Sequence, residues 1–428
     1  MPVNQKMKNI KVRYGPSPTG VPHIGNVRTA LFNFLFAKSQ KGQFLLRIED
    51  TDQARIVQGA VKKIQESLKL LNLEWDGEII FQSKRLEIYK KHLEILKEKK
   101  LAYEESGAWR FKVQTSKPSI SWQDIVHGEV TFPTKVLEDF IIIKSDGFPT
   151  YHFASVVDDH LMEISHVLRG DEWISSTPKH ILLYEAFGWS HPYFVHLPPI
   201  LGAEHKKLSK RDGAKSVMEY INEGYLPEAL INFMVLLGWS PKSNQEIFSL
   251  EDLSKEFSLD RINKNSPVFN TEKLNWFNGQ WIRKVDVQSL AALLSKRFPD
   301  YEKSKIIDIC PIVKDRMTLT SDFQTLAGFL FENKIQINPK QVILSKDELQ
   351  KLTEAYKNIS PNNWNKVNIS SATVSMMEEQ GLSKPETFSS IGVAVSGSKV
   401  TPPIFDTLEK LGQEKTIKRL EDVIKFKK

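Results

Sequence analysis

One stretch near the start of the chain decides the fold: residues 10–26 read IKVRYGPSPTGVPHIGN. Residues 10–14 predict a buried strand, and the prolines and glycines that follow predict a loop. Apolar residues then recur at helical spacing over 27–35, so a helix is expected to begin near His23. Residues 44–48 predict a second strand. This order of strand, loop, helix and strand is a βαβ unit and predicts a parallel, doubly wound sheet.

A second motif, KLSKR at residues 207–211, places three cations and a hydroxyl between Gly202 and Gly213. The start of a helix attracts phosphate through its unpaired N–H groups and its dipole. Lysines contact phosphate oxygens as point charges, and a loop flanked by glycines can close over them. Alone, each motif is typical of a turn or a solvated surface. Together they predict a nucleoside triphosphate held between a helix N-terminus and a cationic loop.

The composition is that of an ordinary protein with several domains. The 428 residues are 40% apolar and 26% charged, and no apolar run approaches the roughly 18 residues that span a bilayer. Residues 1–11 are polar and lack the apolar core of a secretory signal. The single cysteine, Cys310, excludes an internal disulfide and a multi-cysteine zinc site. A cytoplasmic protein with no membrane partner is therefore expected.

The charge balance is basic, with 59 Lys and Arg against 52 Asp and Glu, a net charge of +7. Such an excess is compatible with a polyanionic partner such as RNA, although many other enzymes are equally basic.

Further along, amphipathic spacing predicts helices over 59–71 and 84–100. Short β-like runs separated by turns then predict a compact insertion between two halves of the sheet domain; they lie at 109–113, 129–132 and 140–143. The sheet pattern resumes over 151–168 and 193–201. The chain after Lys210 is predicted to be mostly helical and to end in a helix pair, 405–426, broken at Gly412.

These motifs resemble those of a known family. His23-Ile24-Gly25-Asn26 is similar to the HIGH signature of class I aminoacyl-tRNA synthetases, with Asn26 for the second histidine, and residues 207–211 resemble their KMSKS signature. More strings resemble the bacterial-type glutamyl-tRNA synthetases over nearly the whole chain: RIEDTD at 47–52, TYHF at 150–153, VDDH at 157–160, VLRGDE at 167–172 and GYLPEAL at 224–230.

The resemblance implies a fold and a division into domains. A Rossmann-like doubly wound parallel sheet is expected to form the catalytic domain, with a short mixed insertion, followed by mostly α-helical C-terminal domains. The expected segments are the first catalytic half (1–81), a shortened acceptor-end-binding insertion (82–150), the second catalytic half (151–200), a KMSKS-like loop with a tRNA stem-contact region (201–286) and a helical anticodon-binding region (287–428).

The resemblance also implies a reaction in two steps. The α-carboxylate of glutamate attacks the α-phosphate of ATP to give glutamyl-adenylate and pyrophosphate, and the terminal adenosine of tRNA(Glu) then takes the glutamyl group. The first step is expected to need bound tRNA. Mg²⁺ arrives with ATP, and a monomer is the family expectation. Catalysis of this kind depends on positioning and on charge stabilisation more than on acid–base groups.

The implied amino-acid pocket supplies two cations and one anion, because glutamate carries two carboxylates and one ammonium. Arg13 resembles the residue that pairs with the side-chain carboxylate, and Arg169 supplies a second guanidinium. Glu49 is expected to hold the ammonium, while Ser17 and Tyr151 add hydrogen bonds. A bidentate Arg–carboxylate pair is charge-assisted and geometrically selective.

The implied nucleotide site uses both signatures. His23 and Lys210 are expected to contact the ATP phosphates, with Lys207 and Ser209 assisting. Gly25 lets the backbone approach the nucleotide, and Asn26 in the same signature is a further candidate for the ATP site. Glu172 is a candidate for the ribose.

Three places depart from the family or invite a second interpretation. Ser155 stands where relatives often have a larger amide or apolar residue near the glutamate pocket. Between Tyr103 and Trp109 the chain lacks several dozen residues that relatives usually carry, sometimes with zinc-binding cysteines, so zinc is not expected. Residues 158–160 (DDH) suggest a metal cluster, but hydrogen bonding at a strand end is the preferred interpretation, since they offer one histidine and two adjacent carboxylates.

Other functions stay open at this point. A truncated relative that glutamylates a tRNA base would lack residues 287–428, and a small-molecule adenylyltransferase would need no tRNA. A non-catalytic tRNA-binding paralogue would not need the intact His23, Lys207 and Lys210. Charging of tRNA(Gln) also stays open, because anticodon bases are read by stacking and edge contacts that periodicity does not place.

Overall fold

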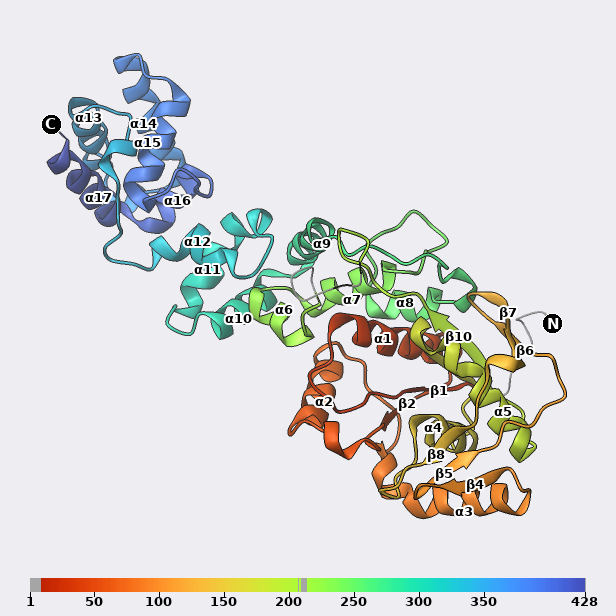
Figure 1. The fold of residues 1–428 in the computed structure, drawn as a ribbon. Helices are drawn as coiled ribbons and strands as arrows, with labels where there is room; N and C mark the ends of the chain where they lie inside the picture. The colour runs from red at the N-terminus through yellow and green to blue at the C-terminus, as the bar shows by residue number, and fades with distance from the viewer. Residues whose placement is uncertain (1–8, 207, 209–213, 428) are drawn as a thin grey trace. The chain divides into compact units, whose positions relative to one another are not determined.

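The computed structural model describes residues 9–206, 208 and 214–427. Contacts divide the chain into two compact units. The first contains the chain up to Asn222 together with Pro227–Leu274, and the second contains Glu223–Leu226 together with the chain from Asn275 onward. Strands and helices alternate through much of the first unit, and the described part of the second is helical (Figure 1). The predicted fold class is confirmed.

The opening stretch forms the βαβ unit that the sequence predicts. β1 (Lys11–Tyr14) pairs in parallel with β2 (Gln43–Ile48), and β2 pairs in parallel with β3 (Ile80–Phe81). α1 (Ile24–Ser39) makes the crossover between β1 and β2. It is buried along most of its length, because β1 and β2 contact one side of it while α7 and α8 contact another.

A second group of strands continues the sheet. β9 (His166–Gly170) and β10 (Tyr193–Leu197) are parallel, and β6 (Ser119–Asp124) pairs in parallel with β10 and antiparallel with β7 (Gly128–Pro133). The backbone N–H of Ser165, just before β9, donates to the carbonyl of Lys11 at 2.9 Å. This bond places β9 beside β1, so the parallel strands run in the order β3-β2-β1-β9-β10.

The expectation of a sheet over 151–168 is wrong for its first part. α4 (Tyr151–Leu161) occupies that segment, and a strand begins only at His166. A short apolar run buried on most sides does not distinguish a strand from a buried helix, and α4 is such a run. Residues 158–160 accordingly lie in the last turns of a helix and not at a strand end.

The insertion is also less separate than the sequence suggests. β4 (Ala102–Glu105), β5 (Ala108–Phe111) and β8 (Phe140–Ile143) form an antiparallel sheet of their own. β6 and β7, however, extend the parallel sheet through the pairing of β6 with β10. Part of the insertion is therefore built into the catalytic sheet.

The remaining helices agree with the predicted pattern, including the helices at 59–71 and 84–100 and the terminal pair broken at Gly412. In the first unit they are α2 (Ala60–Leu70), α3 (Leu86–Glu98), α5 (Thr177–Phe187), α6 (Val217–Glu223, except its last residue), α7 (Pro227–Leu236) and α8 (Leu250–Glu256). α9 (Thr271–Lys284) contains the boundary between the units. The second unit continues with α10 (Val287–Arg297), α11 (Lys303–Val313), α12 (Asp322–Ala327), α13 (Lys346–Lys357), α14 (Lys366–Gln380), α15 (Lys384–Ser396), α16 (Ile404–Leu411) and α17 (Gln413–Phe426).

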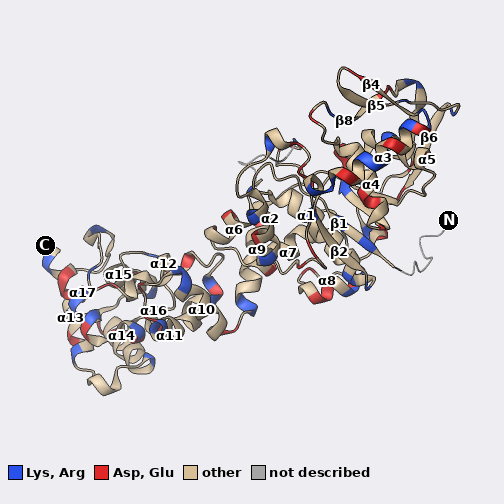
Figure 2. Ribbon diagram, turned by 90° about the horizontal axis from the view of Figure 1, so that it is seen from below, with Lys and Arg blue, Asp and Glu red and all other residues tan. Residues whose placement is uncertain are grey.

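Among the described residues, none of the helices combines the length and the apolarity that crossing a membrane requires. Lys and Arg are interspersed with Asp and Glu on the helices of both units (Figure 2).

The turn from α1 into β2 has room for glycine alone. A Cβ at Gly42 would lie 2.3 Å from the carbonyl oxygen of Ile10, which accepts the N–H of Gln43 at 2.8 Å. Gly42→Ala should therefore lower the free energy of unfolding by about 1–3 kcal/mol, the usual cost of overpacking. Urea denaturation measures the change. Gln40→Ala, an exposed change in the same turn, should stay within about 0.5 kcal/mol of the wild type; equal effects of the two variants would contradict this explanation.

Candidate active site

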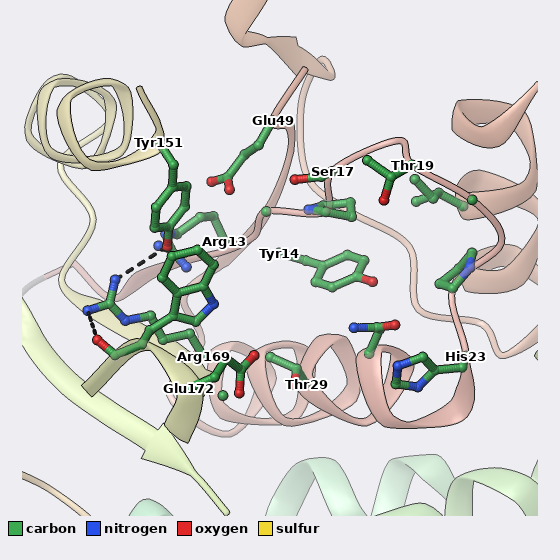
Figure 3. Close-up of a pocket in the computed structure, with 18 of the residues that line it drawn as sticks. Arg13, Tyr14, Ser17, Thr19, His23, Thr29, Glu49, Tyr151, Arg169 and Glu172 are labelled. Carbon is green, nitrogen blue, oxygen red and sulfur yellow. Dashed lines mark hydrogen bonds between the residues drawn. The ribbon is translucent and has the colours of Figure 1, made fainter. Parts of the chain in front are cut away.

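A cavity of about 400 Å³ lies at the carboxyl ends of β1, β2 and β9, beside the first turn of α1 (Figure 3). Ligands of parallel α/β sheets bind at this edge. The cavity brings together most of the residues that the sequence singles out: Arg13, Ser17, His23, Asn26, Glu49, Tyr151, Arg169 and Glu172. Gly25 adjoins two of them without lining the cavity itself. Lys207, Ser209 and Lys210 lie outside the described residues.

A network of buried charges holds two of the lining residues, Arg13 and Glu49. Asp159 on α4 accepts from Arg13 of β1 (Nε–Oδ1 2.9 Å, Nη2–Oδ2 3.3 Å) and from Arg47 of β2 (Nη1–Oδ1 2.6 Å). Arg47 also donates to Glu49, with Nη2–Oε1 at 2.9 Å, and to the hydroxyl of Ser155 at 3.4 Å. All of these residues are less than a tenth exposed. Among the described residues Nη1 of Arg13 makes no hydrogen bond to a protein group, so its N–H groups could donate to a ligand in the cavity.

The two carboxylates of this network differ in their electrostatics. Burial alone would raise the pKa of Asp159, but the charges of Arg13 and Arg47 outweigh burial and lower it. For Glu49 the balance is reversed, and burial raises its pKa despite the neighbouring guanidinium groups. Glu49 thus has less cationic compensation than Asp159, and a cationic ligand group beside it would favour its charged form.

Gly15 makes room for the Glu49 carboxylate. A Cβ at Gly15 would lie 2.5 Å from Oε1 of Glu49. The side chain of Glu49 therefore reaches across the backbone of the β1–α1 loop to the cavity, as Figure 3 shows.

Arg169 on β9 lies at the other wall. Its Nη1 donates to the Tyr151 hydroxyl at 3.3 Å and to Nδ1 of His180 at 3.1 Å, and its Nη2 donates to the Thr177 hydroxyl at 2.8 Å. Burial lowers the pKa of His180, as it does that of the adjacent His152, to about 4 in the latter case. These neighbours are therefore neutral at ordinary pH.

The first turn of α1 supplies the opposite end of the cavity. Nδ1 of His23 accepts from the N–H of Gly25 at 3.0 Å and so caps the helix. A Cβ at Gly25 would lie 2.9 Å from the His23 ring, so the glycine allows this cap. The N–H of Ile24 donates to the carbonyl of Lys215 at 3.0 Å, which joins the helix start to the chain just after the second motif.

Sequence reasoning missed several residues of the site. For Asp159 the sequence predicts hydrogen bonding, as found, but it places the residue at a strand end and names no partner. Arg47 enters the sequence analysis only as part of the string RIEDTD. Asp159 and Arg47 lie behind the lining residues, whereas four further missed residues line the cavity itself: Tyr14, Thr19, Thr29 and Trp173. Trp173 packs on Tyr151 with ring centroids 4.1 Å apart. An arginine within an otherwise apolar strand, as at Arg47, was the available signal, because a buried charge needs a partner.

The carboxylate of Asp158, the neighbour of Asp159, also accepts hydrogen bonds from other side chains of the protein. It accepts from Gln82 at 3.0 Å, from Tyr89 at 2.7 Å and from Nε of Arg85 at 2.8 Å. The pair of aspartates thus joins α4 to its surroundings on two sides.

Comparisons with known proteins show the family to which this fold belongs. The family described as "tRNA synthetases class I (E and Q), catalytic domain" matches residues 9–108 and 104–276, and that described as "Anticodon binding domain" matches residues 287–424. The glutamate–tRNA ligase of Dehalococcoides mccartyi is 38% identical over 472 residues of alignment, which cover 96% of this chain and 97% of the relative. Glutamate–tRNA ligase 1 of Caldanaerobacter subterraneus subsp. tengcongensis is also 38% identical, with 98% of each chain covered.

A solved structure is similar throughout. The glutamate tRNA ligase of Elizabethkingia meningosepticum, crystallised in complex with its amino acid, has a TM-score of 0.88 and 32% identity, and the match covers 98% of this chain and 100% of that one. The chain therefore belongs to the glutamate–tRNA ligases, a family of class I aminoacyl-tRNA synthetases.

Proposed function

We propose that this protein activates L-glutamate with ATP and transfers it to the 3′-terminal adenosine of tRNA(Glu). The α-carboxylate forms a bond to the α-phosphorus of ATP while the bond to pyrophosphate breaks. A ribose hydroxyl of tRNA then attacks the acyl carbon and releases AMP. The observation that carries the proposal is the placing of Arg13 and Glu49 in one cavity beside the N-terminus of α1. Membership of class I implies ATP as a substrate, together with Mg²⁺.

In the proposed pocket, each charged group of glutamate meets a group of opposite charge or a donor. Nη1 of Arg13 binds the side-chain carboxylate, and Glu49 binds the ammonium. Ser17 and Tyr151 donate hydrogen bonds, and Arg169 adds positive charge behind Tyr151. Glutamine would leave the buried Arg13 partly uncompensated, and unpaired buried polar groups discriminate strongly between substrates.

The nucleotide occupies the other end of the cavity in this proposal. The N-terminus of α1 and His23 attract phosphate, and the close backbone turn at Gly25 and Asn26 permits the approach. Lys207, Ser209 and Lys210 neutralise the developing charge on the leaving pyrophosphate. Glu172 contacts the ribose.

For the tRNA we propose the division expected from the sequence. Residues 82–150 contact the acceptor end, residues 201–286 the stem and residues 287–428 the anticodon. The alignment with the Dehalococcoides relative is longer than this chain, so that relative contains residues with no counterpart here. We infer a cytoplasmic monomer that uses no zinc. The match of 287–424 to an anticodon-binding domain favours tRNA charging over glutamylation of a tRNA base.

The first test is pyrophosphate exchange. Exchange with glutamate should require tRNA(Glu), and Lys210→Ala should slow it by about 10²–10³-fold, the usual loss when one charge-stabilising donor is removed. The affinity for tRNA should change little. Lys62→Ala, an exposed change on α2, is the control. Equal exchange with and without tRNA would contradict the tRNA dependence, and an active Lys210→Ala variant would contradict the role of the lysine.

The second test concerns Arg13. Arg13→Ala should raise the KM for glutamate far more than the KM for ATP, by about tenfold or more, because a charge-assisted hydrogen bond contributes about 1.5–3 kcal/mol. Steady-state aminoacylation with each substrate varied in turn gives both constants. Arg13→Lys keeps the positive charge but loses the planar guanidinium. Its KM for glutamate should therefore lie between those of the wild type and Arg13→Ala. A larger rise for ATP than for glutamate would refute the pocket assignment.

A further inference from the structure

Arg169 is a buried cation without a carboxylate in direct contact among the residues that the structure describes. It is 5% exposed, and its guanidinium donates to neutral groups: the hydroxyls of Thr177 and Tyr151, the rings of His180 and His196, and, at 3.5 Å, the carbonyl of Trp173. A buried charge of this kind depends on how well its neutral acceptors are oriented.

One of these acceptors, His196, is held in a single tautomer. Nε of Arg169 donates to Nε2 of His196 at 3.1 Å, and Nδ1 of His196 lies 2.6 Å from Oδ2 of Asp124. Both His196 and Asp124 are fully buried. An ionised carboxylate only accepts, so Nδ1 carries the proton and Nε2 offers its lone pair to the arginine. The Thr177 hydroxyl, 3.3 Å from Nε2, donates instead to the carbonyl of Trp173 at 3.0 Å.

Asp124 is itself held rigidly. Its Oδ1 accepts from the backbone N–H groups of Val126 at 3.0 Å and His127 at 3.1 Å, in the turn between β6 and β7. Burial would raise its pKa, but these bonds and the bond to His196 lower it. The carboxylate is therefore ionised and fixed in direction.

The Nη1 end of the Arg169 guanidinium contacts a residue that lines the cavity. Its Nη1 donates to the Tyr151 hydroxyl at 3.3 Å, and Tyr151 faces the cavity (Figure 3). A hydroxyl that accepts from a guanidinium turns its own hydrogen away from it. The hydrogen is then available to a ligand in the cavity.

We propose that Asp124 is a positioning residue of the glutamate pocket, acting through His196 and Arg169 to direct the Tyr151 hydroxyl toward the substrate. The inference rests on the proposed function and extends it. Asp124 lies in the segment 82–150, expected to contact tRNA, and 72 residues before His196. A part of the insertion thus contributes to recognition of the amino acid.

Asp124→Asn tests the inference in the full-length enzyme with tRNA(Glu). The amide of asparagine can donate to Nδ1 as well as accept, so the other tautomer of His196 becomes accessible and its Nε2–H then opposes the N–H of Arg169. The KM for glutamate should rise about five- to thirtyfold, the range for one lost buried hydrogen bond. The KM for ATP should stay within about twofold of the wild-type value, because the proposed nucleotide site lies at the other end of the cavity.

Asp139→Asn is the matched control. Asp139 lies in the same insertion and accepts from the N–H of Val113 at 2.7 Å and from the Tyr103 hydroxyl at 3.0 Å. If Asp124 only held the insertion together, both variants would act alike. The inference expects the KM for glutamate of Asp139→Asn to equal that of the wild type, whatever the variant does to tRNA binding.

A double-mutant cycle with Tyr151→Phe identifies the path. If Asp124 acts through the Tyr151 hydroxyl, the losses in kcat/KM for glutamate will be less than additive. Additive losses, or an equal rise in the KM values of glutamate and ATP, would overturn the inference. A wild type without glutamate-dependent activity would instead overturn the proposed function. Should Asp124→Asn fail to fold, ¹H–¹⁵N spectra of the wild-type histidines decide the question, because an Nε2–H tautomer of His196 is incompatible with the inference.

Discussion

The carboxylate of Asp159 joins the three elements that build the pocket. It lies on α4 and accepts from Arg13 of β1 and Arg47 of β2, all three side chains being almost completely buried. Removing one partner of such a pair typically costs about 3–5 kcal/mol, because the remaining charge stays buried without compensation. The bond to Asp159 uses Nε and Nη2 of Arg13 and thereby fixes the direction of Nη1. In the proposed function, recognition of the glutamate side chain depends on this direction.

The backbone imposes a second constraint, and two glycines meet it. At Gly15 the absence of a side chain lets Glu49 reach the cavity, and at Gly25 it lets His23 cap α1. The Glu49 carboxylate thus lies beside the start of the β1–α1 loop, and the His23 ring lies at its end. In the proposed function, the Glu49 carboxylate at one end of the loop binds the ammonium group, and the N-terminus of α1 at the other end attracts phosphate.

Much of the site could be predicted from the sequence because its residues follow predicted strands or begin a predicted helix. Arg13 and Glu49 adjoin strand ends, and His23 begins α1, so topology alone brings them to one edge of the sheet. The helix at 151–161 was missed because its buried apolar run lacks a clear period. Arg47 and Asp159 were missed as partners because they are 112 residues apart, and nothing local indicates which buried charges will meet.

The sequence by itself determined the βαβ unit, the helical C-terminal half and the residue types at the cavity, since these follow from periodicity, turn residues and short motifs. Only the tertiary structure decided which charges pair and which proton positions are fixed. The carboxylate of Asp124, which lies in the insertion, reaches His196 because β6 joins the catalytic sheet beside β10. Such pairings arise from packing between distant segments, whereas a sequence pattern reports only on the conformation of its own segment.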